Sequence, residues 1–124
     1  NCNLIVTATP SRTPLVQADL VQKGTHITAM GSDTPEKQEL ESAILQKADI
    51  VVVDSISQGK LRGEMYKALE AGVLKAEDVV ELGQVVIDKE LQRTSDDQVT
   101  VTDLTGVAVQ DYQISKAVYE ALKA

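Results

Sequence analysis

The segment "DIVVVDS" (residues 49–55) constrains the fold more than any other part of the chain. It places four consecutive β-branched residues between two aspartates, with no polar residue inside the run. A strand that is apolar on both faces needs cover on both faces, which is typical of an interior strand of a parallel sheet. The core must be built from Val, Ile, Leu and Ala, because the chain contains neither Phe nor Trp. The segment therefore predicts an α/β fold.

Strand patterns alternate with helix patterns along the rest of the chain. Further strands are predicted at residues 3–9, 26–30 and 98–104, and helices at residues 15–24, 63–72, 75–89 and 107–124, with a helix or turn at 35–48 that starts after Thr34. This order, β-α-β-α-β-α-α-β-α, predicts a mostly parallel sheet flanked by helices. The last helix carries an apolar stripe that is predicted to face the core: Val107, Val109, Ile114, Val118 and Leu122.

Size and charge limit the class of protein. A chain of 124 residues forms a single domain, residues 1–124, and its net charge of −7 lacks the clustered Lys and Arg that nucleic-acid binding needs. No apolar segment has membrane-spanning length, and the single Cys2 excludes an internal disulfide, so we expect a cytoplasmic protein. Asp96 and Asp97 lie in a polar, loop-like stretch, and no spacing in the chain predicts a metal site.

The carboxyl ends of the predicted strands carry the residues most suited to binding. In parallel sheets these ends meet at one edge, where ligands bind. Three of the four exits combine an acid with small, hydroxyl or glycine residues, which supply hydrogen bonds and let a ligand approach the main chain. The four exits are Thr7–Pro10, Met30–Asp33, Asp54–Ser57 and Asp103–Gly106. The sequence therefore predicts a binding site at this edge.

Each candidate residue also has a structural interpretation. Asp33 before Thr-Pro is equally suited to capping a helix or turn, and Lys37 is by default a solvated lysine. Thr7 and Thr9 are residues that strands favour in any sheet. His26 has no acid or second ligand beside it in sequence, so a structural role is expected.

Several motifs occur in the order found in one known family. The segments "VTATPSRTPLV", "GTHITAMGSDTPEKQEL", "ADIVVVDS", "GE", "ELGQVV" and "RTSDDQVTVTDLTGVAVQDY" resemble the ornithine cyclodeaminase/mu-crystallin family over nearly the whole chain. Members of that family join a Rossmann-like NAD(P)-binding domain to a second, dimer-forming substrate domain. The resemblance implies that this chain is the later half of the Rossmann-like domain. The G-x-G-x-x-G fingerprint and the first βαβ half are then expected upstream, since no G-x-G occurs here.

The resemblance also implies roles for individual residues. Asp33 stands where the family has its catalytic acid/base, which also contacts the substrate, and Thr105 stands where the family contacts the substrate. The expected cofactor contacts are Thr7, Ala8, Thr9, Ile27, Thr28, Ala29, Met30, Lys37 and Leu104. Many relatives have serine at position 104 and glycine at position 36, where this chain has Leu104 and Glu36.

The function implied by the resemblance is an NAD-dependent ornithine cyclodeaminase, with NADP as an alternative cofactor. In that reaction NAD+ takes a hydride from the α-carbon of the amino acid, the distal amine closes on the imine, and the hydride returns. An amino-acid dehydrogenase or imine reductase of the same family is the first alternative, and a non-catalytic crystallin-like binding protein is the second. We expect the full-length protein to be a homodimer and the isolated 124-residue chain to be inactive, because half a cleft cannot position two reactants.

Overall fold

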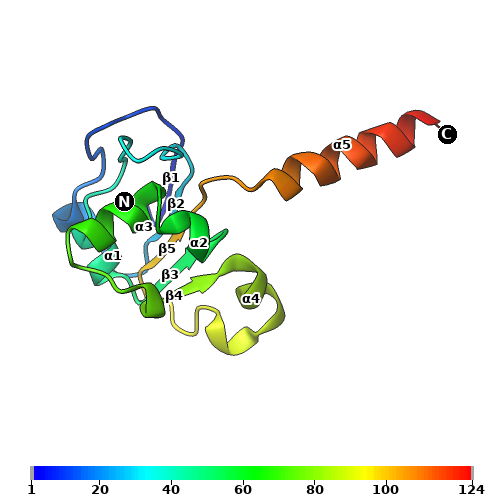
Figure 1. Ribbon diagram of the computed structural model, residues 1–124. Coiled ribbons are helices and arrows are strands. Elements are labelled where there is room, and N and C mark those ends of the chain that lie inside the picture. Colours follow the sequence, from blue (N-terminus) through cyan, green and yellow to red (C-terminus); the bar gives the residue numbers. More distant parts are fainter. Residues whose placement is uncertain (1, 124) are drawn as a thin grey trace.

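A computed structural model describes residues 2–123 of the chain. Within these residues five strands form a single sheet in the order β1-β2-β5-β3-β4, and every neighbouring pair is parallel (Figure 1). The strands are β1 (Leu4–Thr7), β2 (His26–Ala29), β3 (Ile50–Val53), β4 (Val79–Glu81) and β5 (Thr100–Asp103). The predicted parallel α/β fold is confirmed.

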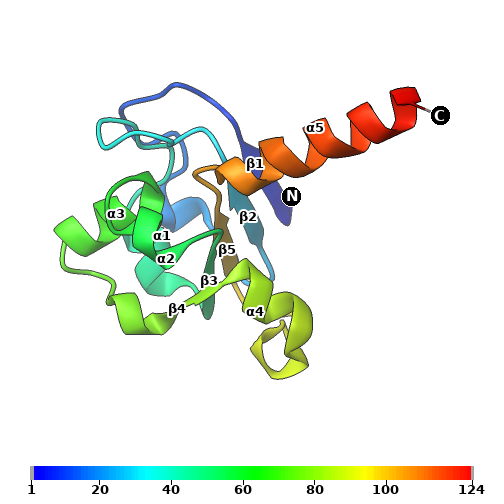
Figure 2. The same cartoon turned by 45° about the vertical axis from the view of Figure 1, so that its right-hand side comes forward.

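One face of the sheet carries the hydrophobic core. Alternate strand residues such as Ile27, Val51 and Val101 point to this face, where they pack against Ile44 of α1 (Ala43–Lys47) and Met65 of α3 (Gly63–Glu70). Figures 1 and 2 show α1 and α3 together on one side of the sheet, with α4 (Leu82–Ile87) apart from them. Full burial of each aliphatic side chain contributes roughly 1.5–3 kcal/mol, so this face supplies most of the driving force for folding.

The opposite face is covered only in part. α4 and the short 3-10 helix η3 (Lys89–Leu91) lie against it, and Val52 is buried there, so β3 is covered on both faces as predicted. On the edge strand β1, by contrast, Leu4 and Val6 are 57% and 59% exposed. His26 also points to this face, where its ring contacts the hydroxyls of Thr100 and Thr28 at 2.7 and 3.1 Å. The expected structural role of His26 fits this position.

The helix predicted at residues 15–24 is wrong, because these residues contain only the 3-10 turn η1 (Ala18–Leu20). The segment predicted as a helix or turn at residues 35–48 begins with a turn, and its helix starts only at Ala43. The main-chain carbonyl of Glu39 accepts hydrogen bonds from Leu15 and Val16 at 2.7 and 3.2 Å, so both segments make long-range bonds instead of helical ones. Asp33 therefore does not cap a helix, because the segment after it forms a turn in which Lys37 donates to the Thr34 carbonyl at 3.2 Å.

The segment predicted as a helix at residues 75–89 contains a strand that the sequence pattern missed. It begins with the 3-10 turn η2 (Ala76–Asp78), continues as β4 beside β3, and only then becomes helical as α4. Val79 is buried in the core. Pairing with an interior strand therefore overrides the helical spacing of the apolar residues, which is the usual way in which tertiary context defeats a local pattern.

The last helix lies outside the body of the protein. α5 (Ala108–Lys123) projects away from the sheet in both views, whereas the shorter α2 (Ile56–Gly59) lies against the carboxyl ends of the strands (Figures 1 and 2). None of the described residues of α5 is buried, and Ile114 and Leu122 are 62% and 82% exposed. The prediction that its apolar stripe faces the core is therefore wrong. Among the residues that the structure describes, no helix combines the length and apolar character needed to cross a bilayer.

Candidate functional site

The carboxyl ends of the strands are aligned at one edge of the sheet. Thr7 of β1 is in register with Ala29 of β2, which is in register with Asp103 of β5, and the same row continues to Val53 of β3 and Glu81 of β4. The four predicted exits thus leave the sheet from one edge. The predicted convergence of the exits at one edge is confirmed, and it follows from the parallel topology.

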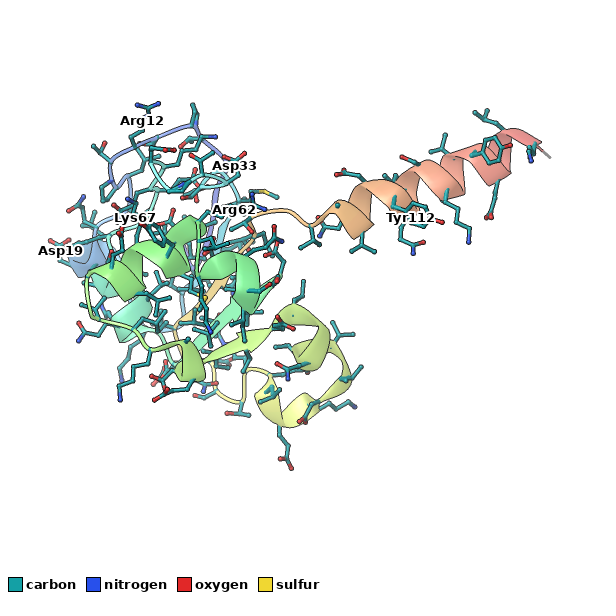
Figure 3. The ribbon with its side chains drawn as sticks, in the orientation of Figure 1. Arg12, Asp19, Asp33, Arg62, Lys67 and Tyr112 are labelled. Atoms are coloured by element: carbon teal, nitrogen blue, oxygen red, sulfur yellow. The ribbon has the colours of Figure 1, made fainter. Side chains whose placement is uncertain are left out.

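Asp33 is presented to solvent just beyond β2. Its side chain is 53% exposed, and its Oδ1 lies 2.5 Å from Nζ of Lys37, whose side chain is 26% exposed. The hydrogen bond from Lys37 lowers the pKa of Asp33, and the charge of Arg62 adds to the effect. Figure 3 shows Asp33 and Arg62 at the same end of the molecule, although they belong to different segments. Asp33 is therefore an accessible, ionised carboxylate, suited to holding an ammonium group or accepting its proton.

The exits of β1 and β2 are tied together by a buried carboxylate. Glu39, which has no exposed surface, accepts hydrogen bonds from the Thr7 hydroxyl at 2.8 Å, the Thr9 amide at 2.5 Å and the Gly31 amide at 2.9 Å. Burial opposes the charged form of Glu39, but the hydrogen bonds from Thr9, Thr7 and Gly31 outweigh it and lower its pKa. A Cβ at position 31 would lie 2.2 Å from the Thr9 carbonyl oxygen, so the close approach requires glycine.

The exits of β3 and β5 are joined in a similar way. Asp54, directly after β3, accepts from the Gly106 amide at 2.7 Å and from the Thr105 hydroxyl at 3.3 Å. The Leu104 amide donates to the carbonyl of Ala29 at 2.8 Å, so this exit is also bonded to β2. Leu104 and Thr105 thus lie beside the other strand ends, and Thr105 is 8% exposed. Their contacts with cofactor and substrate stay predictions.

A second buried acid lies beneath this row. Asp103 ends β5, is 1% exposed and accepts a hydrogen bond from the Met65 amide at 2.8 Å. Burial raises its pKa to about 7, with the charges of Glu64 and Asp54 adding to the shift. Gly63 has a φ of 90°, and a Cβ there would lie 2.7 Å from Oδ2 of Asp103. The start of α3 therefore packs directly against the end of β5.

The remaining predicted cofactor residues fall into two groups. Ala8 and Met30 are exposed at the strand exits. The side chains of Ile27 and Ala29 are fully buried in the core, and Thr28 points to the opposite face beside His26. A cofactor at this edge can reach the main chain near Ala29 but not the side chain of Ile27. Contact of these residues with a dinucleotide stays a prediction.

Sequence reasoning missed the buried acids. Glu39 stands inside the quoted motif "GTHITAMGSDTPEKQEL", in the segment predicted as a helix or turn, and Glu64 stands in the helix predicted at residues 63–72. Neither was singled out as a site residue. One signal in the sequence could have pointed to them: each acid stands directly beside an apolar residue, Leu40 or Met65. A buried acid at such a position can accept the main-chain amides that the loops after the strands leave without partners. The two residues are 0% and 1% exposed.

A well-formed hollow lies at the other edge of the sheet. This cavity of about 310 Å³ is lined by Asp49 and Asp78, which directly precede β3 and β4 and so lie at the amino edge. Ligands of parallel sheets bind at the carboxyl edge, where the strand ends and their loops converge. We therefore place the candidate site at the carboxyl edge, around Asp33.

The motifs around this edge agree with a family model. The model of the ornithine cyclodeaminase/mu-crystallin family matches residues 1–124. The chain belongs to this family. An alanine dehydrogenase of Archaeoglobus fulgidus is 48% identical over 120 residues, which are 96% of this chain and 37% of that protein. The chain thus spans little more than a third of the length of the curated relatives that it matches.

Solved structures show the same fold. An archaeal alanine dehydrogenase dimer with bound NAD matches with a TM-score of 0.89 and 47% identity, over 96% of this chain and 37% of that chain. The iminosuccinate reductase of Paracoccus denitrificans in complex with NAD+ gives 0.89 and 41%, over 97% and 37%. A lysine cyclodeaminase gives 0.81 and 27%, over 98% and 34%. Relatives in this family are NAD-linked oxidoreductases and cyclodeaminases.

Proposed function

We propose that this chain carries the nicotinamide side of the cofactor site in an NAD-dependent enzyme that acts at the α-carbon of an amino acid. We further propose that it is the later half of a Rossmann-like domain in a longer, two-domain protein that forms a homodimer. The observation that carries the proposal is the exposed, ionised Asp33 at the aligned carboxyl ends of parallel strands. The NAD complexes of two structural relatives support the choice of cofactor.

The residues at the edge fit a flat nicotinamide ring. Ala8 and Met30 are exposed, and a Cβ built on Gly106 meets open space, so a ring can approach the main chain of three exits. Thr105 and Asp54 close the far side with a hydrogen bond between them at 3.3 Å. When bound, the nicotinamide accepts or donates the hydride. The described residues supply no G-x-G loop, so the pyrophosphate would be held by another part of the longer protein.

Asp33 then manages the proton. Oxidation at the α-carbon of an amino acid converts its ammonium group to an imine, and the nitrogen must lose a proton before the hydride leaves. A carboxylate at a strand end can hold the ammonium and accept this proton, a role worth roughly 10²–10⁴-fold in rate. The hydrogen bond from Lys37 lowers the pKa of Asp33 and so keeps its carboxylate ionised. Loss of the carboxylate would leave the reacting nitrogen without a base.

The reaction that we favour is a dehydrogenase or reductase reaction, in which hydride transfer completes the turnover. The relatives above 40% identity are an alanine dehydrogenase and an iminosuccinate reductase. Cyclodeamination of ornithine or a related diamino acid is the second candidate, because a lysine cyclodeaminase shares the fold over 98% of this chain. Both reactions begin with the same hydride transfer, so both use Asp33 in the same way.

One assay separates the candidates. The intact protein is incubated with alanine and stoichiometric NAD, and separately with ornithine and catalytic NAD, and both NADH and cyclic products are measured. A dehydrogenase forms NADH in proportion to the oxo acid or imino acid formed. A cyclodeaminase forms proline and ammonia with no net NADH. Binding of NAD without turnover of any amino or imino acid would instead favour a crystallin-like binding protein and would refute the proposal.

A further inference from the structure

Glu39 is the most thoroughly bonded acidic side chain at the carboxyl edge, and its partners come from two different strand exits. Oε1 accepts the Thr9 amide, and Oε2 accepts both the Thr7 hydroxyl and the Gly31 amide. Thr7 ends β1 and Thr9 follows it, whereas Gly31 follows β2 and stands two residues before Asp33. One carboxylate therefore fixes the position of both loops relative to each other.

A buried carboxylate is costly unless hydrogen bonds replace its water. Three donors supply that replacement here, and two of them are main-chain amides of the half-buried residues Thr9 and Gly31. The bonds hold Glu39 ionised, because they lower its pKa against the effect of burial. An aliphatic residue could fill the same space but could not accept these bonds. The carboxylate is therefore required by the geometry of the two loops.

Glu39 is itself held from below by a second acid. Oε1 of Glu64, at the start of α3, accepts the Glu39 amide at 2.7 Å, and Oε2 accepts the Leu40 amide at 3.1 Å. The Glu39 carbonyl accepts from Leu15 and Val16. Every polar group of Glu39 is thus bonded, and a chain of contacts runs from α3 through Glu39 to the loop that carries Asp33.

We propose that Glu39 is a positioning residue for hydride transfer: it sets the Thr7–Thr9 segment and the Asp33 loop as one rigid unit against the nicotinamide. The proposal rests on the proposed function. It assigns Glu39 no contact with substrate or cofactor. Its effect comes through the two loops that it holds.

The deciding variant is Glu39→Gln in the intact protein. Whichever way the Gln amide is turned, its NH₂ faces either the Thr9 amide or the Gly31 amide, and two donors repel. One loop must therefore move. A mutation far from the reacting atoms that misplaces them by about 1 Å can lower the rate roughly 10²-fold. We expect the single-turnover rate constant of hydride transfer, measured per bound NAD, to fall by about that factor, and NAD affinity to fall severalfold.

Glu41→Gln is the matched control. Glu41 also accepts a main-chain amide, that of Ala18 at 2.7 Å, but Ala18 belongs to η1 and not to a strand exit. The variant makes the same chemical change two residues away. Its rate constant per bound NAD and its NAD affinity should equal those of the wild type. A merely structural role for Glu39 would lower the folded fraction of the variant and leave the rate constant per bound NAD unchanged.

Glu64→Gln keeps the proposal testable if Glu39→Gln does not fold. It weakens the support of the Glu39 amide or the Leu40 amide, so the rate constant per bound NAD should fall by a smaller factor in the same direction. Wild-type rate constants in the folded Glu39→Gln or Glu64→Gln variants would overturn the proposal while the proposed function stands. If the wild type turns over no amino or imino acid, the proposed function fails, and unchanged NAD affinity in Glu39→Gln would then overturn the positioning role as well.

Discussion

Two layers of acids at the carboxyl edge of the sheet differ in what they bind. In the inner layer, Glu39, Glu64 and Asp103 are at most 1% exposed and accept main-chain amides. In the outer layer, Asp33 is half exposed and pairs with the long, flexible side chain of Lys37. Main-chain partners cannot leave without unfolding, whereas a lysine can be displaced by a substrate ammonium. The inner acids build the edge, and the outer acid is free to act there.

The largest expected effect is on the outer acid. Asp33→Asn should lower kcat by roughly 10²–10⁴-fold, because an amide cannot accept the proton of the reacting nitrogen. NAD affinity and the free energy of unfolding should change little, since the side chain is exposed. Asp19→Asn is the control, because Asp19 is an exposed aspartate far from Asp33 (Figure 3). The measurement is steady-state kinetics. Full activity of Asp33→Asn would show that the outer acid does not act in catalysis and so does not differ in role from the inner acids.

A substitution in the inner layer should act on stability instead. Gly63→Ala forces a side chain onto a residue with φ of 90° and places its Cβ 2.7 Å from Oδ2 of Asp103. Strain and overpacking together should lower the free energy of unfolding by roughly 2–4 kcal/mol, measured by chemical denaturation. Gly83→Ala, in α4 with nothing near the added Cβ, should raise it by about 0.5–1 kcal/mol. Equal effects at the two positions would contradict the packing of α3 against β5.

Two of the inner acids, Glu64 and Asp103, should also give stability an unusual dependence on pH. Burial raises the pKa of Glu64 and of Asp103 to about 7, from ordinary values of 4.5 and 3.8. The folded state therefore holds these protons more tightly than the unfolded state. Their contribution is fully present below about pH 4 and is lost as pH rises to about 7, at up to about 1.4 kcal/mol per pH unit for each group.

Denaturation of the wild type and of Glu64→Gln across this pH range checks the assignment. The glutamine in the variant does not titrate, so the unfolding free energy of the variant should fall less steeply between pH 5 and pH 7. An identical slope in the two proteins would show that Glu64 does not hold its proton in the fold.

The smallest effect should come from the partner of the outer acid. Lys37→Met removes the hydrogen bond that lowers the pKa of Asp33, so this pKa should return toward its ordinary value. The acidic limb of the pH profile of kcat/KM should then move to higher pH. The free energy of unfolding should change by less than about 0.5 kcal/mol, because an exposed ion pair contributes little. An unmoved acidic limb would show that Asp33 is not the group that titrates.

The sequence by itself determined the class of fold and the edge at which the strand exits meet. The run at residues 49–55 and the alternation of strands with helices predicted a parallel sheet, and four of its five strands are where they were expected. Parallel topology then brings the strand exits to one edge, so the exits that carry Asp33 and Thr105 could be assigned to the same edge before any coordinates. The order of the motifs predicted the family, which the family model confirms.

Only the tertiary structure decided how the edge is held together. The bonds of Glu39 to Thr7, Thr9 and Gly31 span 8 to 32 residues of sequence, and no local pattern encodes such pairs. The strand β4 and the late start of α1 were missed for a related reason, since pairing and long-range bonds outweigh helical spacing there. A periodic pattern reports which residues prefer burial. The residue that each buried side chain contacts depends on how segments distant in sequence pack, and this packing is decided only in the folded structure.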